Sequence, residues 1–142
     1  MRFSLILSIL ITLFIWVNSL LPGSVSSAQS GFIVGLADDL LSLFGIQVSL
    51  DTLSLIIRKL AHFFEFFLLG ITLSIYLIKE KKTIYHALWI GLIIAIIDET
   101  IQLFVDGRAS SIIDVGIDFI GVGFGVFITH LLTKIYIKSN PK

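Results

Sequence analysis

The sequence predicts an all-α, polytopic membrane protein: a four-helix transmembrane bundle with a short amphipathic interfacial helix in its first outer loop. Composition is the first observation, because 56% of the 142 residues are hydrophobic and only 14% are charged, whereas soluble domains carry roughly 25% charged residues. Second, the apolar residues gather in four runs that are long enough for the roughly 20 residues of helix needed to cross a bilayer. Third, these runs lack the period-two alternation of barrel strands.

The four runs form one domain that spans residues 1–142. We expect helices at about 3–21, 54–78, 84–105 and 112–137, with an outer loop at 22–53. The net charge is zero, so no basic surface indicates binding to nucleic acid. The sequence has no cysteine, which excludes disulfides and thiolate metal sites.

The first run has two interpretations. Arg2, the apolar run and the small residues at 26–28 have the order of a signal peptide with its cleavage site. However, the run is longer than most signal h-regions, and Pro22-Gly23 ends it cleanly. These features favour a retained helix, although the sequence leaves cleavage open.

The basic residues indicate which end of the bundle faces the cytoplasm. With four spans, one side of the membrane collects most of them: Arg2, Lys79, Lys81, Lys82, Lys134, Lys138 and Lys142. The opposite side has only Arg58, Lys59 and Arg108, all close to or within helices. Since cytoplasmic loops carry the excess of Lys and Arg, we expect a multi-pass protein of the cytoplasmic membrane with both termini in the cytoplasm.

The expected outer loop has a helical pattern of its own. Its apolar residues recur at roughly helical spacing: Phe32, Ile33, Leu36, Leu40, Leu43 and Phe44. Asp38, Asp39 and Ser42 fall largely on the other face. This pattern predicts a short amphipathic helix, which either lies along the outer interface or packs over the mouth of the bundle.

The predicted topology brings charged residues of three helices to the same outer level. At about 1.5 Å per residue, Glu65, Asp98 and Asp118 would each lie roughly 10 Å below the outer boundary. Helical spacing places polar and small residues on three stripes: Arg58, His62, Glu65 and Leu69; Gly91, Ala95, Asp98 and Gln102; and Asp114, Asp118, Gly121 and Gly125. The Gly121-x-x-x-Gly125 step also allows another helix to approach closely. We therefore expect these stripes to face the bundle interior.

Most of the charged residues also have a structural interpretation. Arg58 and Lys59 fit interfacial anchoring, and Ser111 with Asp114 fits a capping box. Asp106 and Arg108 fit solvation of the turn around Gly107. Three acids, Glu65, Asp98 and Asp118, are expected too deep for capping or snorkelling. Ionisable groups cost several kcal/mol in hydrocarbon unless they are paired or hydrated, so this clustering favours a functional site over a structural ion-pair network.

Two motifs carry a resemblance to a known family. The first is Arg58-Lys59-Leu60-Ala61-His62-Phe63-Phe64-Glu65-Phe66-Phe67-Leu68-Leu69-Gly70, and the second is Asp98-Glu99-x-x-Gln102-x-Phe104, followed by Arg108, Asp114 and Gly121-x-x-x-Gly125. With the four-helix layout, they resemble the VanZ-like family of bacterial membrane proteins over nearly the whole chain. Phe66 stands where that family usually has Tyr, and Asp118 where it usually has Asn. The resemblance implies a place in the Gram-positive-type cell envelope and a link to susceptibility to the glycopeptide antibiotic teicoplanin, but no particular reaction.

The leading functional hypothesis is binding or remodelling of an anionic envelope lipid or lipid-linked glycan at the outer leaflet. The expected ligand-binding residues are Arg58, Lys59, Glu99, Gln102, Arg108, Asp114 and Asp118. Guanidinium forks suit phosphate oxygens, and the helix N-terminus after Ser110-Ser111 adds a positive dipole end for the same anion. Four phenylalanines would contact the acyl or isoprenoid chains: Phe63, Phe64, Phe66 and Phe67.

The second hypothesis is a membrane-embedded hydrolase or transferase that acts on lipid-linked envelope substrates. Its catalytic residues would be His62, Glu65 and Asp98, with the histidine as general acid or base. Carboxylates with a histidine also suit a divalent metal, but no recognised motif is present, so the sequence assigns no metal ligands and identifies no cofactor. Whether any reaction is catalysed stays open.

A proton-coupled transporter is a third hypothesis, but four helices leave little room for alternating access unless the chain oligomerises. The expected partners are membrane lipids or lipid-linked glycans, and not nucleic acid. A homo-oligomer or an envelope-protein partner is left open by the sequence.

Overall fold

The computed structural model describes residues 2–139 and confirms the predicted all-α membrane class. Lys142, counted above among the basic residues, lies outside this range. The helices are α1 (Arg2–Ser19), α2 (Gly23–Leu43), α3 (Leu50–Lys79), α4 (Ile84–Gln102) and α5 (Ile112–Ser139). All except α2 are long and apolar enough to cross a membrane, so the chain is a multi-pass membrane protein.

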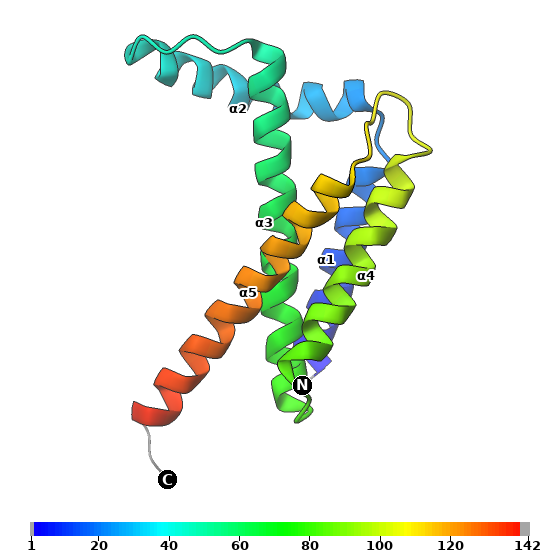
Figure 1. Ribbon diagram of the computed structural model, residues 1–142, viewed down its shortest axis with the longest axis vertical. Helices are drawn as coiled ribbons and strands as arrows, with labels where there is room; N and C mark the ends of the chain where they lie inside the picture. The colour runs from blue at the N-terminus through cyan, green and yellow to red at the C-terminus, as the bar shows by residue number, and fades with distance from the viewer. Residues whose placement is uncertain (1, 140–142) are drawn as a thin grey trace.

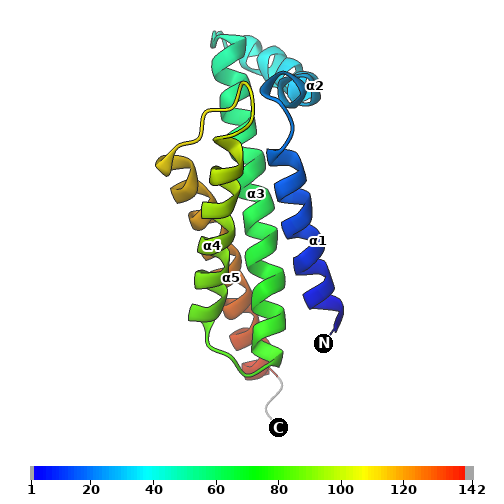
Figure 2. The ribbon, with the colours of Figure 1, turned by 90° about the vertical axis from the view of Figure 1, so that its right-hand side faces the viewer.

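The central helix of the bundle is α3. It contacts each of the other four helices, and α4 also packs against α1 and α5. The start of α1, the α3–α4 turn and the end of α5 lie at one end of the bundle, whereas α2 lies across the opposite end (Figures 1 and 2). The backbone N–H of Gly23 donates to the Asp106 carbonyl at 3.0 Å, which joins the start of α2 to the segment between α4 and α5. The basic α3–α4 turn and both ends of the described chain therefore share one side.

The core follows from the spacing of apolar residues on α3. Phe66, Leu69, Leu73 and Leu77 recur every three or four residues and so lie on one face of the helix, where each is at most 7% exposed. Residues of the other helices complete the cluster: Ile15, Ala87, Ile94, Ala95, Val122 and Val126. Many large apolar side chains on the outside, such as Phe127, are exposed. This outer surface suits contact with lipid rather than with water.

Glycines determine how closely α5 crosses α3. A Cβ atom added at Gly121 would lie 2.6 Å from the Phe63 carbonyl oxygen, and one added at Gly125 would lie 2.2 Å from the Phe67 carbonyl oxygen. Both distances are shorter than any van der Waals contact, so a side chain at either position would push the helices apart. The close approach predicted for Gly121-x-x-x-Gly125 therefore occurs, and its partner is α3. One turn earlier on α5, the same crossing brings Asp118 toward α3.

The helix in the outer loop is longer than the short helix that the sequence predicts. The apolar stripe begins at Phe32, but α2 already begins at Gly23. The residues of its first half are mostly small and polar, a composition typical of a loop. This half is nevertheless helical, and the Ser30 hydroxyl donates to the Ser26 carbonyl at 3.2 Å. Of the residues of α2, only Gly23 and Val34 are buried. Most of the apolar stripe is therefore exposed rather than packed on the bundle.

Two other bounds differ from those predicted by three or four residues. The second spanning helix begins at Leu50 instead of about 54, because Ser49 caps it: the Ser49 hydroxyl accepts a hydrogen bond from the Thr52 N–H at 3.3 Å. The third ends at Gln102 instead of about 105, since the chain turns at 103–107 and Gly107 has a positive φ of 72°. This turn leads directly into the polar segment before α5.

Candidate functional site

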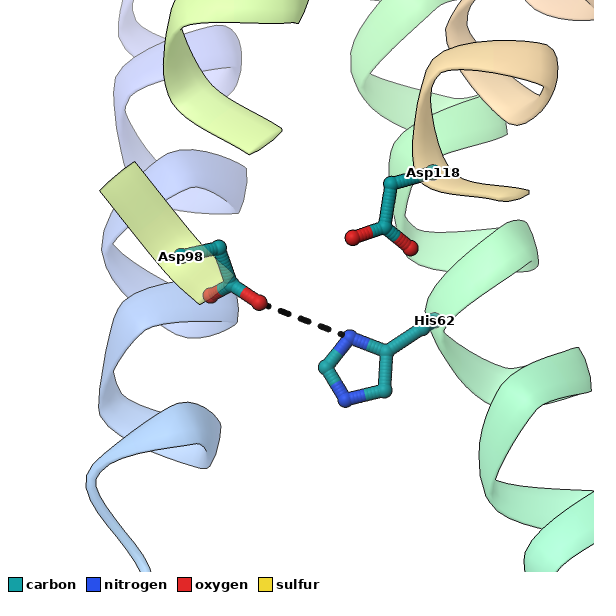
Figure 3. Close-up of side chains that lie close together, drawn as sticks. All are labelled: His62, Asp98 and Asp118. Atoms are coloured by element: carbon teal, nitrogen blue, oxygen red, sulfur yellow. Dashed lines mark ion pairs between the residues drawn. The ribbon is translucent and has the colours of Figure 1, made fainter. Parts of the chain in front are cut away.

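Three helices each bring one ionisable side chain to a common point inside the bundle. His62 comes from α3, Asp98 from α4 and Asp118 from α5, and their side chains point toward one another (Figure 3). His62 Nδ1 lies 3.8 Å from Asp98 Oδ2, and one nitrogen or oxygen atom from each of the three residues lies within 4.8 Å of the others. Asp98 is 0% exposed and Asp118 is 1% exposed. Both acids therefore face the interior, as their stripes indicate.

Gln102 holds the acids of α4 in place. Its Nε2 donates to Asp98 Oδ2 at 2.9 Å, to Glu99 Oε1 at 3.2 Å and to Ser19 Oγ at 3.3 Å. All four residues are buried. A single side-chain amide thus orients two carboxylates and connects them to the end of α1.

Glu99 connects α4 to the start of α5. Its Oε2 accepts a hydrogen bond from the Ser111 backbone N–H at 3.0 Å, and the Ser111 hydroxyl in turn accepts one from the Ile113 N–H at 3.1 Å. Ser111 therefore caps α5 as expected, but the carboxylate that accepts its N–H belongs to Glu99 of α4 and not to Asp114. The Glu99 carboxylate thus accepts a hydrogen bond at the N-terminus of α5, where the sequence led us to expect an external anion.

The end of α1 forms another wall of the site. Asn18 Nδ2 donates to Glu65 Oε1 at 3.0 Å. Arg108 Nε donates to the Leu21 carbonyl at 3.0 Å, and its Nη2 donates to the Asn18 carbonyl at 2.7 Å. The Asn18 carbonyl belongs to the last turn of α1 and the Leu21 carbonyl follows it, so neither has the usual donor four residues later in the helix. Arg108 therefore caps α1, rather than solvating the turn around Gly107.

The three basic residues of the site differ in their partners. Lys59 Nζ forms an ion pair with Asp114 Oδ1, and backbone oxygens hold Arg108. Burial lowers the pKa of Arg108 below its ordinary value, and the nearby charge of Arg58 lowers it further. Arg58 is half-buried and has no hydrogen-bond or ion-pair partner among residues 2–139. Of these three bases, Arg58 is thus the one whose guanidinium is free to bind an external anion.

Several buried polar atoms at this level have no hydrogen-bond partner within the described chain. They are His62 Nδ1, Glu65 Oε2, Asp98 Oδ1 and Asp118 Oδ2. Buried polar groups in proteins are nearly always satisfied, and leaving one unsatisfied costs about 1–3 kcal/mol. Four such atoms from three helices indicate that the site receives a group other than its own side chains.

Two cavities meet at this point, and both are lined by Arg58 and His62. The smaller has a volume of about 30 Å³ and lies among α3, α4 and α5, where Asp118 also lines it. The other is a crevice of about 190 Å³ at the junction of α1, α2 and α3. Its polar lining includes Asn18, Ser26, Gln29, Ser30, Glu65 and Arg108. A larger cavity of about 420 Å³ lies at the opposite end of the bundle, but its lining is mostly apolar, so the polar end is the candidate site.

The residues singled out from the sequence gather at this end of the bundle. They are His62, Glu65, Asp98, Arg58, Lys59, Glu99, Gln102, Arg108, Asp114 and Asp118. One associated expectation was wrong: Phe66 cannot contact a lipid chain, because it is 0% exposed and lies in the core, whereas Phe64 is 59% exposed. The individual roles of the gathered residues stay predictions.

Sequence reasoning missed two contributors to the site. Asn18 and Ser19 bind Glu65 and Gln102, respectively, yet the first run was treated only as an uncharged span. Their polarity at its outer end was the available signal. It also missed the polar wall from α2, although Ser26, Gln29 and Ser30 have helical spacing.

The apolar spans and the buried polar cluster between them define a class: a helical membrane protein with its site inside the bundle, near one membrane surface. The sequence model of the VanZ/LLP1 family matches residues 3–133, and the chain belongs to that family. The matched region contains every site residue described above. Neither the curated proteins nor the solved structures include a match.

Proposed function

We propose that this protein binds a phosphate-bearing lipid or lipid-linked glycan at the outer leaflet, with Arg58 as the main ligand for the anion. One observation carries the proposal: Arg58 has no partner among residues 2–139 and lines both cavities at the polar site. A guanidinium forms paired, charge-assisted hydrogen bonds to phosphate oxygens. Because Lys59 and Arg108 are held by other groups, they supply positive potential rather than free donors.

The surroundings of the crevice support a lipid rather than a free anion. The crevice lies beside α2, whose apolar side chains Phe32, Leu36 and Leu40 are exposed. An amphipathic helix with such a face lies in the membrane interface. A lipid whose phosphate reaches Arg58 would thus keep its chains against the apolar outer surface of the bundle, where Phe64 is exposed.

The orientation of the protein is part of this proposal. The α3–α4 turn carries Lys79, Lys81 and Lys82, which favours a cytoplasmic position for that end and an outer position for the site. Because the chain has no cysteine, single substitutions test this cleanly. A membrane-impermeant maleimide added to intact cells should label Ser27→Cys and leave Lys82→Cys unlabelled. Labelling of Lys82→Cys alone would place the site on the cytoplasmic side and contradict the proposal.

The binding experiment compares two arginine variants of the full chain in lipid nanodiscs. Retention of a polyprenyl phosphate is measured by native mass spectrometry, with phosphatidylcholine as a neutral competitor. Arg58→Gln should weaken binding about 10–100-fold, because a charge-assisted hydrogen bond contributes about 1.5–3 kcal/mol. Arg2→Gln, at the opposite end, should have no effect. Equal binding by wild type and Arg58→Gln would refute the proposal, and retention of inorganic phosphate alone would exclude a lipid ligand.

A second candidate function is a membrane-embedded hydrolase or transferase. The observation that favours it is His62 Nδ1, which lies 3.8 Å from Asp98 Oδ2 and has no hydrogen-bond partner. A histidine next to a carboxylate can transfer protons as a general acid or base. Turnover of a polyprenyl diphosphate, measured as release of phosphate, should then be lost in His62→Gln while binding through Arg58 persists. If no turnover occurs in the wild type, binding alone is the function.

A link to glycopeptide susceptibility is the physiological side of the proposal and comes from the family resemblance. Expression of the chain in a susceptible Gram-positive host should raise the inhibitory concentration of teicoplanin if the bound lipid belongs to cell-wall synthesis. Arg58→Gln should abolish that rise at equal protein level. An unchanged concentration for the wild type would separate this chain from that phenotype.

A further inference from the structure

We infer that His62, Asp98 and Asp118 form a binding site for one divalent transition-metal ion, Mn²⁺ or Zn²⁺. The three side chains come from α3, α4 and α5 and converge on one point (Figure 3). One potential ligand atom of each lies within 4.8 Å of the others. Ligands of a tetrahedral ion at bond lengths of about 2.1 Å lie roughly 3.4 Å apart, so an ion would draw these side chains together by about 1 Å.

The unsatisfied atoms of the site support an ion directly. His62 Nδ1, Asp98 Oδ1 and Asp118 Oδ2 are buried without a hydrogen-bond partner in the described chain. The two aspartates are 0% and 1% exposed, so bulk water does not satisfy them. Glu99, by contrast, has a donor for each carboxylate oxygen: Gln102 Nε2 for Oε1 and the Ser111 N–H for Oε2. Each of the three residues thus keeps one buried ligand atom without a hydrogen bond, and His62 Nδ1 lies 3.8 Å from Asp98 Oδ2.

The charge of the surroundings also favours a cation. Five acids line the two polar cavities or pair with His62: Glu65, Asp98, Glu99, Asp114 and Asp118. The bases are Arg58, Lys59 and Arg108. With every group ionised, five acids and three bases leave an excess of two negative charges, which one divalent ion would balance. Buried charges without compensation are strongly destabilising, so the site needs either protons or such an ion.

The ligand types indicate the class of ion. An imidazole nitrogen with two carboxylates suits Zn²⁺ or Mn²⁺, whereas Ca²⁺ takes six to eight oxygen ligands. Gln102 donates to Asp98 Oδ2 at 2.9 Å and so leaves Asp98 Oδ1 free to bind. Hydrogen bonds of this kind orient metal ligands. The adjoining cavity of about 30 Å³ has room for a further small ligand, since one water needs at least about 10–15 Å³.

The inference goes beyond the proposed lipid binding and does not depend on it. Arg58 carries the lipid proposal, whereas the metal site uses His62, Asp98 and Asp118. An experiment can therefore refute the lipid proposal without refuting the metal site, and the reverse.

The test measures the metal alone on the purified full chain in detergent. The protein is stripped with a chelator and titrated with MnCl₂, and free Mn²⁺ is followed by electron paramagnetic resonance. We expect one ion per chain. Asp98→Asn and Asp118→Asn should each weaken binding by at least about 100-fold, because loss of a supporting partner alone costs 10–100-fold. A chain that takes up no stoichiometric Mn²⁺, and no Zn²⁺ in a parallel titration, would overturn the inference.

Controls separate ligation from general electrostatics. Asp114→Asn removes an acid that lines the same small cavity but is not one of the three converging residues, and it should change the affinity only a few-fold. Arg58→Gln should bind the metal at least as tightly as the wild type while losing the lipid. Equal losses in Asp114→Asn and Asp118→Asn would show a diffuse acidic surface and contradict a defined site.

Pulsed paramagnetic resonance of the wild type gives a first readout that does not depend on the folding of any variant. Mn²⁺ bound through His62 should show a magnetic coupling to ¹⁴N from the imidazole, and His62→Gln should lose it. Bound Mn²⁺ without that coupling in the wild type would place the ion elsewhere and refute the assignment.

Discussion

The Asn18 side-chain amide donates a hydrogen bond of 3.0 Å to the Glu65 carboxylate, which joins the last turn of α1 to the polar stripe of α3. Beside it, Arg108 donates to the Asn18 carbonyl at 2.7 Å. One residue of α1 therefore contacts both an acid and a base of the site. The first span is thus a structural part of the site and not only a membrane anchor.

Replacement of Asn18 by Ala should lower the free energy of unfolding by about 1–2 kcal/mol, because it leaves the half-buried Glu65 carboxylate without a donor. Reversible unfolding in mixed detergent and SDS measures this change. The double variant with Glu65→Gln should lose much less than the sum of the single effects, since both remove the same interaction. Strictly additive losses would mean that the two side chains do not interact.

The contacts of α1 also predict that the first helix is retained. Ile15 and Ser19 are 0% exposed, so removal of α1 would uncover both the core and the site. Protein isolated from bacterial membranes should therefore have the mass of the full chain, and an N-terminal epitope tag should copurify with the bundle. A mature protein that begins near residue 29 would instead support the signal-peptide interpretation.

The crossing of α3 and α5 depends on particular glycines. Gly125→Ala should destabilise the protein by about 1–3 kcal/mol, because the new methyl group overlaps the Phe67 carbonyl. Gly123 is the matched control on the same helix, since a Cβ there meets nothing within 4 Å. Gly123→Ala should leave stability unchanged or raise it by about 0.5–1 kcal/mol through helix propensity. Equal effects at the two positions, again by SDS unfolding, would contradict the observed crossing.

Substitution of Arg58 and substitution of Arg108 should differ in their effects on the free energy of unfolding. Arg108→Lys should cost about 1–3 kcal/mol, because a lysine cannot reproduce the paired contacts to the Leu21 and Asn18 carbonyls. Arg58→Lys breaks no recorded contact and should change stability by less than about 0.5 kcal/mol. Thermal unfolding of both variants in the same detergent provides the comparison. A larger loss in Arg58→Lys would reveal a structural role for the free guanidinium.

Much of this arrangement could be predicted because spanning helices obey simple constraints. The length of each apolar run determines the spans, and the helical period places Asp98 and Asp118 on inward faces. The Gly121-x-x-x-Gly125 step indicated a close crossing, although not that α3 was the partner. The alternation of successive spans was enough to bring the charged residues of three helices to one level.

The unpredicted features depend on pairings between distant segments. Ser111 could have been capped by Asp114, which is close in sequence, but Glu99 reaches it from α4. Arg108 turns back to carbonyls at the end of α1, a contact that no local pattern encodes. The first half of α2 has the composition of a loop, and its helical structure was missed for that reason. For Ser111 and Arg108 the tertiary contact outweighs the local preference.

The central claim is that the charged faces of separate helices meet inside the bundle, and paired cysteines test it most directly. The natural chain has no cysteine, so every disulfide formed by mild oxidation in native membranes comes from the introduced pair. His62→Cys with Asp118→Cys should form an intramolecular disulfide rapidly. His62→Cys with Ile120→Cys, whose native side chain is 64% exposed on the outside of α5, should not. Crosslinking of the 62–120 pair but not of the 62–118 pair would show that Asp118 faces away from His62, and it would contradict the account.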